Sequence, residues 1–247
     1  MKKYFAIIFI LVLMPVFSQQ GITTFGLQYK PIIPNRLVGF YEQPFNKDQL
    51  QSTVKQKWGH CLGGVIRIGL TDMISLETGI NFTRRNFNLF FSVPDSGYSA
   101  KNDVAVVSYE IPLSGLIYIR ISDEWYVNTS LGAAMTFFPS DVRTYTEIEA
   151  QGELFQQEGA YRSKVQGAVL ANFGFEYRTK SKGYWYLGAS YHLPFTPIMT
   201  FAMSYEYNNH NDNVVAIDNI SGSYLTADIR YFFNEKKVSE QKKKEKK

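Results

Sequence analysis

The residues of this 247-residue chain that could do chemistry are few, with three histidines and one cysteine among them. His60 precedes Cys61, and such a pair could form a thiol-imidazole dyad or hold a metal, but neighbouring side chains of a strand point to opposite faces. His210 lies in an Asn-rich stretch that is typical of a loop tip. His192 and Ser190 share one face of a strand, where the serine could be a nucleophile and the histidine its base. Hydrogen bonding of both side chains in an interior is the simpler interpretation.

The sequence contains no zinc-ligand spacing, no phosphate-binding glycine loop and no serine elbow. We therefore expect no enzymatic activity, no catalytic residue, no metal site and no cofactor. The single cysteine, Cys61, excludes an intramolecular disulfide framework and is expected to be a small buried residue. A lipid-modifying enzyme remains the third of the functions considered below.

Ionisable residues of the chain offer a second kind of site. They recur on the polar faces of alternating segments, where they could form an ion-paired network. The predicted network contains six basic and four acidic residues: Lys30, Arg67, Arg85, Arg120, Arg178 and Arg230 with Glu77, Glu110, Glu176 and Asp228. We expect this network to fill an enclosed interior and to set strand register; a relay or a narrow ion path is the functional alternative.

The segments that carry these residues alternate with a period of two, which is typical of strands. Residues 225 to 233 show the pattern, with Leu225, Ala227 and Ile229 on one face and Asp228 and Arg230 on the other. Eight such segments are predicted, near residues 24–31, 62–70, 74–83, 107–120, 125–137, 167–178, 185–195 and 225–233.

The two faces favour a membrane barrel over a secreted sandwich. One face carries no charge in any segment, and the other is rich in glycine, which suits a crowded interior. Aromatic residues at segment ends are typical of the girdles that flank a lipid-facing band. The predicted girdle and closing strand contain Tyr29, Trp125, Tyr177, Trp185, Tyr231 and Phe233. The predicted fold is therefore all-β, a transmembrane antiparallel up-and-down barrel.

The connections support this fold. Tight polar turns are predicted at 71–73, 122–124 and 179–183, and they alternate with long connections at 35–59, 92–105, 139–164 and 196–223. An even strand number would place both termini in the periplasm. Residues 199–207 and 214–220 also alternate, so the last connection is either a tall hairpin or an extra strand pair, which would make ten strands rather than eight.

Charge and hydropathy divide the chain into three expected segments. Residues 1–18, a basic start followed by a short apolar run, are expected to be a signal peptide, and residues 19–233 the barrel. The Lys-rich segment 234–247 contributes +4 to the formal charge of +4 and is expected to be a disordered periplasmic tail. Lys2 and Lys3 contribute +2, which leaves residues 4 to 233 with a charge of −2, and nucleic acid is not an expected partner.

Two stretches carry a family resemblance. Ser108-Tyr109-Glu110-Ile111-Pro112-Leu113, followed by Tyr118, and the closing Gly222-Ser223-Tyr224-Leu225 to Arg230-Tyr231-Phe232-Phe233 resemble the PorT-like outer-membrane β-barrel proteins of the Bacteroidetes. The likeness covers roughly residues 20 to 233. It implies an integral protein of the outer membrane of a Gram-negative bacterium, and a few members belong to a secretion and gliding apparatus.

An eight-stranded barrel has an interior just wide enough to be filled by side chains, so a large pore is not expected. We expect a structural or assembly component that contacts outer-membrane lipid and an envelope protein through outer loops or the tail, as a monomer or as a subunit. A narrow transporter for small or apolar solutes is the alternative. The predicted partner loop contains Asp141, Tyr145, Glu147, Glu149, Glu153, Phe155, Glu158 and Tyr161. The first long connection, with Trp58, could pack over the barrel mouth.

Overall fold

The computed structural model describes residues 23–34, 41–71, 73–140, 142–148, 153–179, 182–207 and 214–234. The predicted signal peptide, most of the Lys-rich tail and His210 lie outside the described residues. Apart from one short 3₁₀ helix, Pro94–Ser96, the described elements are strands. None of the described residues form a helix that is both long and apolar enough to cross a membrane.

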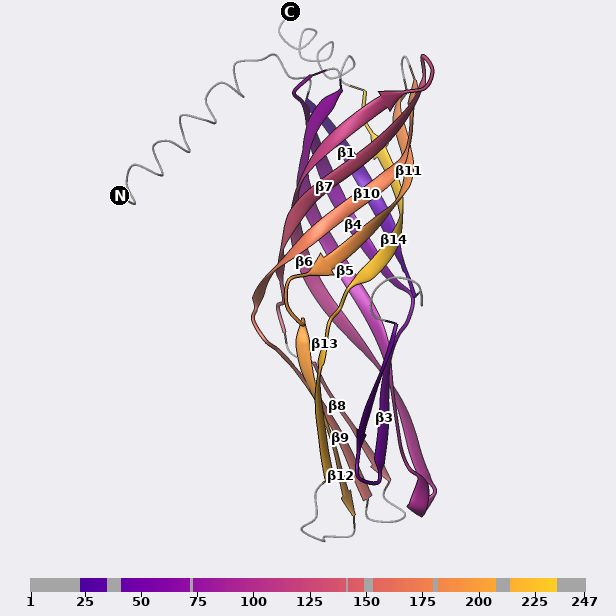
Figure 1. Ribbon diagram of the computed structural model, residues 1–247, viewed down its shortest axis with the longest axis vertical. Helices are drawn as coiled ribbons and strands as arrows, with labels where there is room; N and C mark the ends of the chain where they lie inside the picture. The colour runs from indigo at the N-terminus through magenta and orange to yellow at the C-terminus, as the bar shows by residue number, and fades with distance from the viewer. Residues whose placement is uncertain are drawn as a thin grey trace, which may run out of the picture.

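Eight strands form a closed antiparallel ring, as the alternation predicts (Figure 1). Each strand pairs with the next one in the order that follows, and β1 pairs with β14, with Gly26 opposite Phe232, to close the ring. The ring strands are β1 (Thr23–Ile33), β4 (Gly59–Gly69), β5 (Ile74–Val93), β6 (Tyr98–Arg120), β7 (Trp125–Phe137), β10 (Val165–Thr179), β11 (Gly183–Pro194) and β14 (Tyr224–Phe232).

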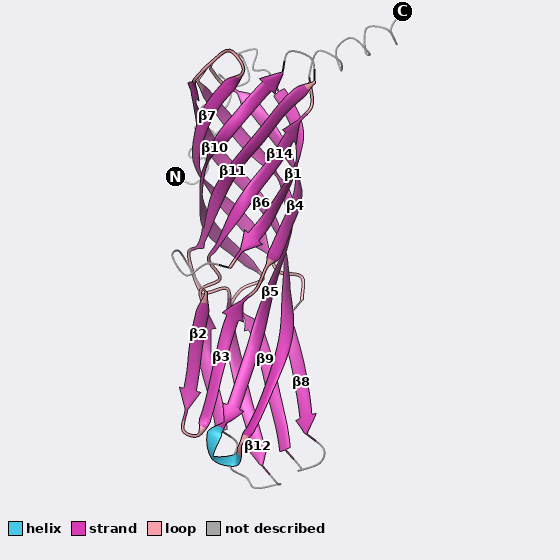
Figure 2. Ribbon diagram, turned by 90° about the vertical axis from the view of Figure 1, so that its right-hand side faces the viewer, coloured by secondary structure: helices cyan, strands magenta, loops and turns pink. Residues whose placement is uncertain are grey.

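Six more strands build an extension beyond one end of the ring (Figure 2). They are β2 (Glu42–Lys47), β3 (Leu50–Gln56), β8 (Val142–Ile148), β9 (Glu153–Tyr161), β12 (Met199–Tyr207) and β13 (Val214–Ile220). β5 and β6 run through both parts. In the extension β3 pairs with the far half of β5, and β2 pairs with β3. The strands β13, β12, β9 and β8 form a second sheet. We call this part the extension and the opposite end of the ring, with its short turns, the turn end.

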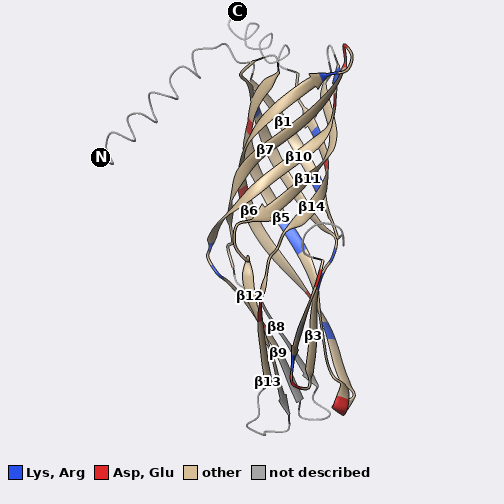
Figure 3. Ribbon diagram, viewed as in Figure 1, with Lys and Arg blue, Asp and Glu red and all other residues tan. Residues whose placement is uncertain are grey.

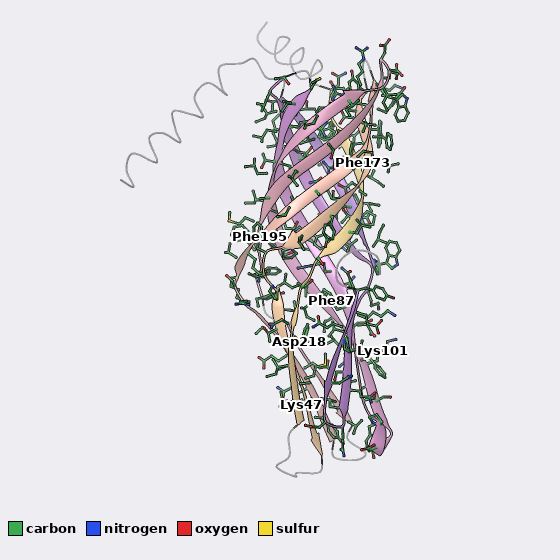
Figure 4. All side chains as sticks on the ribbon, in the orientation of Figure 1. Lys47, Phe87, Lys101, Phe173, Phe195 and Asp218 are labelled. Atoms are coloured by element: carbon green, nitrogen blue, oxygen red, sulfur yellow. The ribbon has the colours of Figure 1, made fainter. Side chains whose placement is uncertain are left out.

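Side-chain hydrogen bonds join the two sheets of the extension. The Gln43 amide on β2 donates to Asp218 Oδ2 on β13 at 2.7 Å, and the Asn102 amide on β6 donates to Gln157 Oε1 on β9 at 3.1 Å. Between the sheets lies an apolar core, in which Phe87 sits just beyond the ring (Figure 4). The buried core residues are Leu50, Val54, Phe87, Leu89, Phe91, Val93, Val104, Val106, Phe138, Ile198, Met199, Phe201, Met203, Tyr205, Ala216 and Ile220.

The extension corrects several expected connections. Residues 92–105 are not a long loop, because β5 and β6 continue to Val93 and from Tyr98 around the 3₁₀ helix at the extension tip (Figure 2). The described part of the first connection forms β2 and β3 of the extension, and Trp58, which was expected to pack over the barrel mouth, is 62% exposed. Residues 199–207 and 214–220 form a tall hairpin in the extension and add no strands to the ring.

The outer wall of the ring is apolar. Leu131, Phe173 and Leu187 are 67%, 54% and 63% exposed, and Figure 4 shows Phe173 on this wall. Charged positions are sparse along the ring strands in Figure 3. A soluble protein rarely exposes so large a continuous apolar surface, so this wall is suited to lipid.

Four predicted girdle residues form one row at the turn end. Trp125, Tyr177, Trp185 and Tyr231 are successive register partners across β7, β10, β11 and β14. The Trp125 and Tyr177 rings lie 5.0 Å apart, and those of Trp185 and Tyr231 lie 4.8 Å apart. The tyrosine hydroxyls donate to turn residues, Glu124 and the Lys182 carbonyl, so each ring has an apolar body and a bonded polar tip. Tyr29 lies apart from this row, opposite Ile229 and Leu62.

Candidate functional site: the charged lumen and its vestibule

A chain of mostly buried charges of alternating sign crosses the lumen. Each member touches the next within 3.5 Å, and the members come from five of the eight ring strands. In order, the chain is Lys30, Asp228, Arg230, Glu77, Arg67, Glu176 and Arg178. Seven of the ten predicted network residues are therefore brought together. Since strand alternation had placed all of them on the inner face, ring closure was the step that made them partners.

Two of these contacts cross the lumen. Arg67 Nη1 on β4 donates to Glu176 Oε2 on β10 at 2.5 Å, and these strands are four places apart in either direction around the ring. Arg230 Nη1 on β14 donates to Glu77 Oε1 on β5 at 2.5 Å. Both guanidinium groups also bind a second carboxylate, and these bonds offset the desolvation free energy of the buried charges. Together the two bridges obstruct the lumen.

A second cluster lies where the ring meets the extension. Tyr224 donates to Glu110 Oε1 at 2.8 Å, and the His192 ring stacks on Tyr224 with centroids 4.6 Å apart. Arg85 donates to the Gly222 carbonyl at 2.7 Å and lies over the Tyr224 ring. Thus Arg85 and Glu110, predicted for the same network, belong to a separate buried group on the extension side of the charge chain.

Glycines make room for this packing. A Cβ at Gly174 would lie 2.5 Å from Tyr186 Cζ, so no larger residue fits beside that ring. The Tyr186 hydroxyl donates to Asn172 Oδ1 at 2.7 Å, and its ring lies 4.6 Å from the Arg230 guanidinium carbon. The small residue on β10 therefore positions an aromatic ring against the charge chain, as expected of a crowded interior.

The prediction for Arg120 is wrong. Its side chain is 59% exposed at the turn end, where it pairs with Asp123 in the turn between β6 and β7. The residue has the inward parity of its strand, but it is the last residue of β6, and the barrel rim leaves it in solvent.

Of the predicted partner loop, Asp141 and Glu149 lie outside the described residues. The remaining members belong to β8 and β9 of the extension, and the side chains of Tyr145, Glu147, Glu153 and Phe155 are not among those described. Glu158 is half-buried. The prediction for Tyr161 needs correction, because its ring stacks on Phe138 at 4.4 Å against the extension core, which makes it a packing residue.

The arrangement around His192 is unlike that of a hydrolase. Ser190 Oγ donates to Asp228 Oδ2 at 2.5 Å instead of pairing with the histidine. Cys61 is buried and free, and His60 is on the other face of β4, as parity predicts. Within the described part of the chain, no group of three or more His, Cys, Asp or Glu side chains is placed to hold a metal ion.

A cavity of about 640 Å³ opens at the turn end, and the Arg67–Glu176 bridge separates it from the rest of the lumen. We call it the vestibule. Three tyrosines, Tyr118, Tyr126 and Tyr184, line it and surround the Arg178 guanidinium, whose carbon lies 4.8, 4.1 and 5.5 Å from their ring centroids. This cage is not predicted from the sequence, although all three tyrosines have the inward parity of their strands.

No family model matches the sequence, and no curated protein is significantly similar to it. Among solved structures, the outer membrane protein OprG of Pseudomonas aeruginosa is similar with a TM-score of 0.53 and 12% identity, over 87% of this chain and 97% of that one. The translocator domain of the autotransporter NalP of Neisseria meningitidis matches 94% of this chain and 95% of its own, at 11% identity and a TM-score of only 0.33. The likeness to OprG concerns the fold, and the chain accordingly has the fold of an eight-stranded outer-membrane β-barrel.

Proposed function

We propose that the protein resides in a bacterial outer membrane as a closed barrel and acts there as a non-catalytic structural or assembly component. The observation that supports this proposal most directly is that the interior is blocked at two places. Ion pairs cross the lumen near the turn end, and an apolar core of sixteen buried residues lies between the two sheets of the extension beyond it. A hydrated path for solutes along the axis would have to break both.

The location and orientation are part of the proposal. The apolar outer wall and the aromatic row support a membrane position, and short turns at one end with tall hairpins at the other support a periplasmic turn end and an outer extension. The end of β14, at Phe232, would then lie on the periplasmic side. The extension would present a rigid sheet surface outside the cell, suited to an envelope or surface partner.

Membership of the PorT-like group is the more specific proposal. The two stretches that resemble this group meet in the structure, because Tyr224 of the closing segment donates its hydroxyl to Glu110 of β6. This contact joins β14 to β6 across the lumen near the extension, so both stretches contribute to the same packed cluster.

Planar-bilayer recording of the refolded full-length protein tests the closed-lumen proposal. We expect no stepwise conductance above that of protein-free membranes, with a known porin refolded in the same detergent as a positive control. Regular single-channel steps would overturn it and favour the narrow transporter.

Purification from native membranes in mild detergent, followed by mass spectrometry, tests the assembly role. We expect a stoichiometric envelope protein that is not recovered with a second barrel of similar abundance. Recovery of the barrel alone would contradict this role.

A further inference from the structure

The charges of the lumen do not balance. Lys30, Arg67, Arg85, Arg178 and Arg230 oppose four carboxylates, Glu77, Glu110, Glu176 and Asp228, and this leaves one positive charge in excess. Because the alternating chain begins and ends with a cation, the excess lies at its ends. One end, Arg178, lines the vestibule and is the end that a ligand could reach from the turn end.

Arg178 is held in place and still has donors to offer. Its Nε donates to Glu176 Oε1 at 2.6 Å, and its side chain remains 30% exposed. Among the described residues, no acceptor bonds its two Nη groups. A guanidinium fixed by a carboxylate and three aromatic rings loses little freedom on binding, and its planar fork matches a carboxylate.

The rest of the vestibule selects for an apolar body on the ligand. Met73 and the three tyrosine rings supply its apolar lining, and Thr24, Thr71 and Ser75 add a few polar groups. A cavity of about 640 Å³ is within the usual size range of small-molecule sites, which are mainly apolar with a few placed polar groups. The other lining arginine at the rim, Arg120, is already paired with Asp123.

We propose that the vestibule is a binding site for a small monocarboxylate with an apolar or aromatic body, whose carboxylate binds the Nη groups of Arg178. The site would be loaded from the turn end without passing through the lumen. It therefore does not depend on whether the barrel conducts, and a conductance measurement leaves it unaffected.

Calorimetric titration of the full-length protein in mild detergent tests the site, with empty micelles as the blank. The probe is phenylacetate; 2-phenylethanol has the same body without the charge, and inorganic phosphate has charge without the body. We expect saturable binding of phenylacetate and at least about tenfold weaker binding of both others. Absence of saturable phenylacetate binding, or equal binding of either comparison compound, would overturn the proposal.

Two variants locate the binding. Arg178→Gln should weaken phenylacetate binding at least about tenfold, while Lys182→Gln, which removes an exposed positive charge at the same end outside the cavity, should change it less than about twofold. An equal loss of phenylacetate affinity in the two variants would show that only the overall positive charge of this end attracts the probe. That result would contradict the proposed site.

Chemical labelling of the unmodified sequence gives a readout that needs no variant to fold. Cyclohexanedione should label the partly exposed Arg178, as mapped by mass spectrometry, and saturating phenylacetate should protect it whereas 2-phenylethanol should not. The exposed Arg162, which does not line the vestibule, should be labelled equally in both samples. Unchanged labelling of Arg178 in the presence of phenylacetate would contradict the proposal.

Discussion

Arg67 on β4 and Glu176 on β10 stand on opposite walls of the ring, yet their side chains meet at 2.5 Å in its centre. The bridge is possible because an eight-stranded barrel is narrow enough for two long side chains to span it. It also joins two halves of the charge chain, since Arg67 binds Glu77 and Glu176 binds Arg178. The same contact therefore closes the lumen, braces the ring and forms the base of the vestibule.

Breaking this bridge should destabilise the barrel. Arg67→Met leaves Glu77 with one partner fewer and Glu176 with only Arg178, and removal of one member of a buried ion pair costs about 3 to 5 kcal/mol. The unfolding free energy in detergent, followed by denaturant titration or by the heat-dependent shift in gel mobility, measures the effect. Arg120→Gln, which breaks the exposed pair with Asp123, should cost less than about 1 kcal/mol. Similar losses in the two variants would show that the lumen bridge is not a structural element.

The extension should unfold separately from the ring when its core is damaged. Phe201→Ala removes a fully buried ring from the extension core, at a cost of about 3 to 5 kcal/mol. We expect faster limited proteolysis within residues 139–164 and 196–223, with the heat-dependent gel shift of the barrel unchanged. Ile217→Ala, on a residue that is 66% exposed, is the matched control and should be cut at the original rate. Loss of the gel shift in Phe201→Ala would mean that the two parts fold as one unit.

The three tryptophans should report two membrane surfaces. Trp125 and Trp185 lie in the aromatic row at the turn end, whereas Trp58 lies between β3 and β4 at the junction with the extension. Single-tryptophan variants in vesicles with brominated lipids should all show shallow quenching, because indoles prefer the interface. With quenchers confined to one leaflet, Trp58 and Trp185 should respond to opposite leaflets. Quenching of both from the same leaflet would contradict the membrane placement.

An exposed ion pair in the extension should give a small pH dependence. The Lys57 ammonium, which donates to Asp103 Oδ2 at 2.7 Å, holds the pKa of that carboxyl below its ordinary value of 3.8. The folded state is thus favoured while Asp103 is ionised. The contribution is complete above the unfolded pKa and is lost as the pH falls through the lowered folded pKa.

The matching measurement compares the original chain with Asp103→Asn. Near pH 6 the extension of the original chain should be more stable than that of Asp103→Asn, by less than about 1 kcal/mol because both side chains of the pair are exposed. In strong acid the two chains should be equally stable. A difference that grows as the pH falls would have the wrong sign for this pair.

Strand parity made much of the ring predictable. Parity indicates whether a side chain faces the lumen or the outer wall. The inward placement of Glu77, Glu176 and Asp228 could therefore be predicted from spacing alone. The same holds for the outward placement of Leu187 and Trp185. The short turns between ring strands were predictable for the same reason, since each interrupts an alternating run with polar residues. The eight-stranded ring is confirmed by the pairing of β1 with β14.

The extension was harder to predict because its strands have no membrane signature. Its segments are short, so residues 42–47 and 50–56 resemble loop sequence. Phe87, Val104 and Phe138 belong to its core, but their burial depends on a second sheet that comes from distant parts of the chain. The end of β6 also escaped prediction, because parity alone does not show where a strand leaves the barrel and exposes Arg120.

Composition and alternation by themselves determined that this chain forms strands with one apolar and one charged face, because the two faces of a strand are a local property of every second residue. Only the tertiary structure decided which of those charges meet. Closing the ring sets the stagger between strands, and this stagger places Arg67 level with Glu176 across the lumen and leaves the donors of Arg178 facing an aromatic vestibule. Partners across a barrel are far apart in sequence, so no local pattern encodes them.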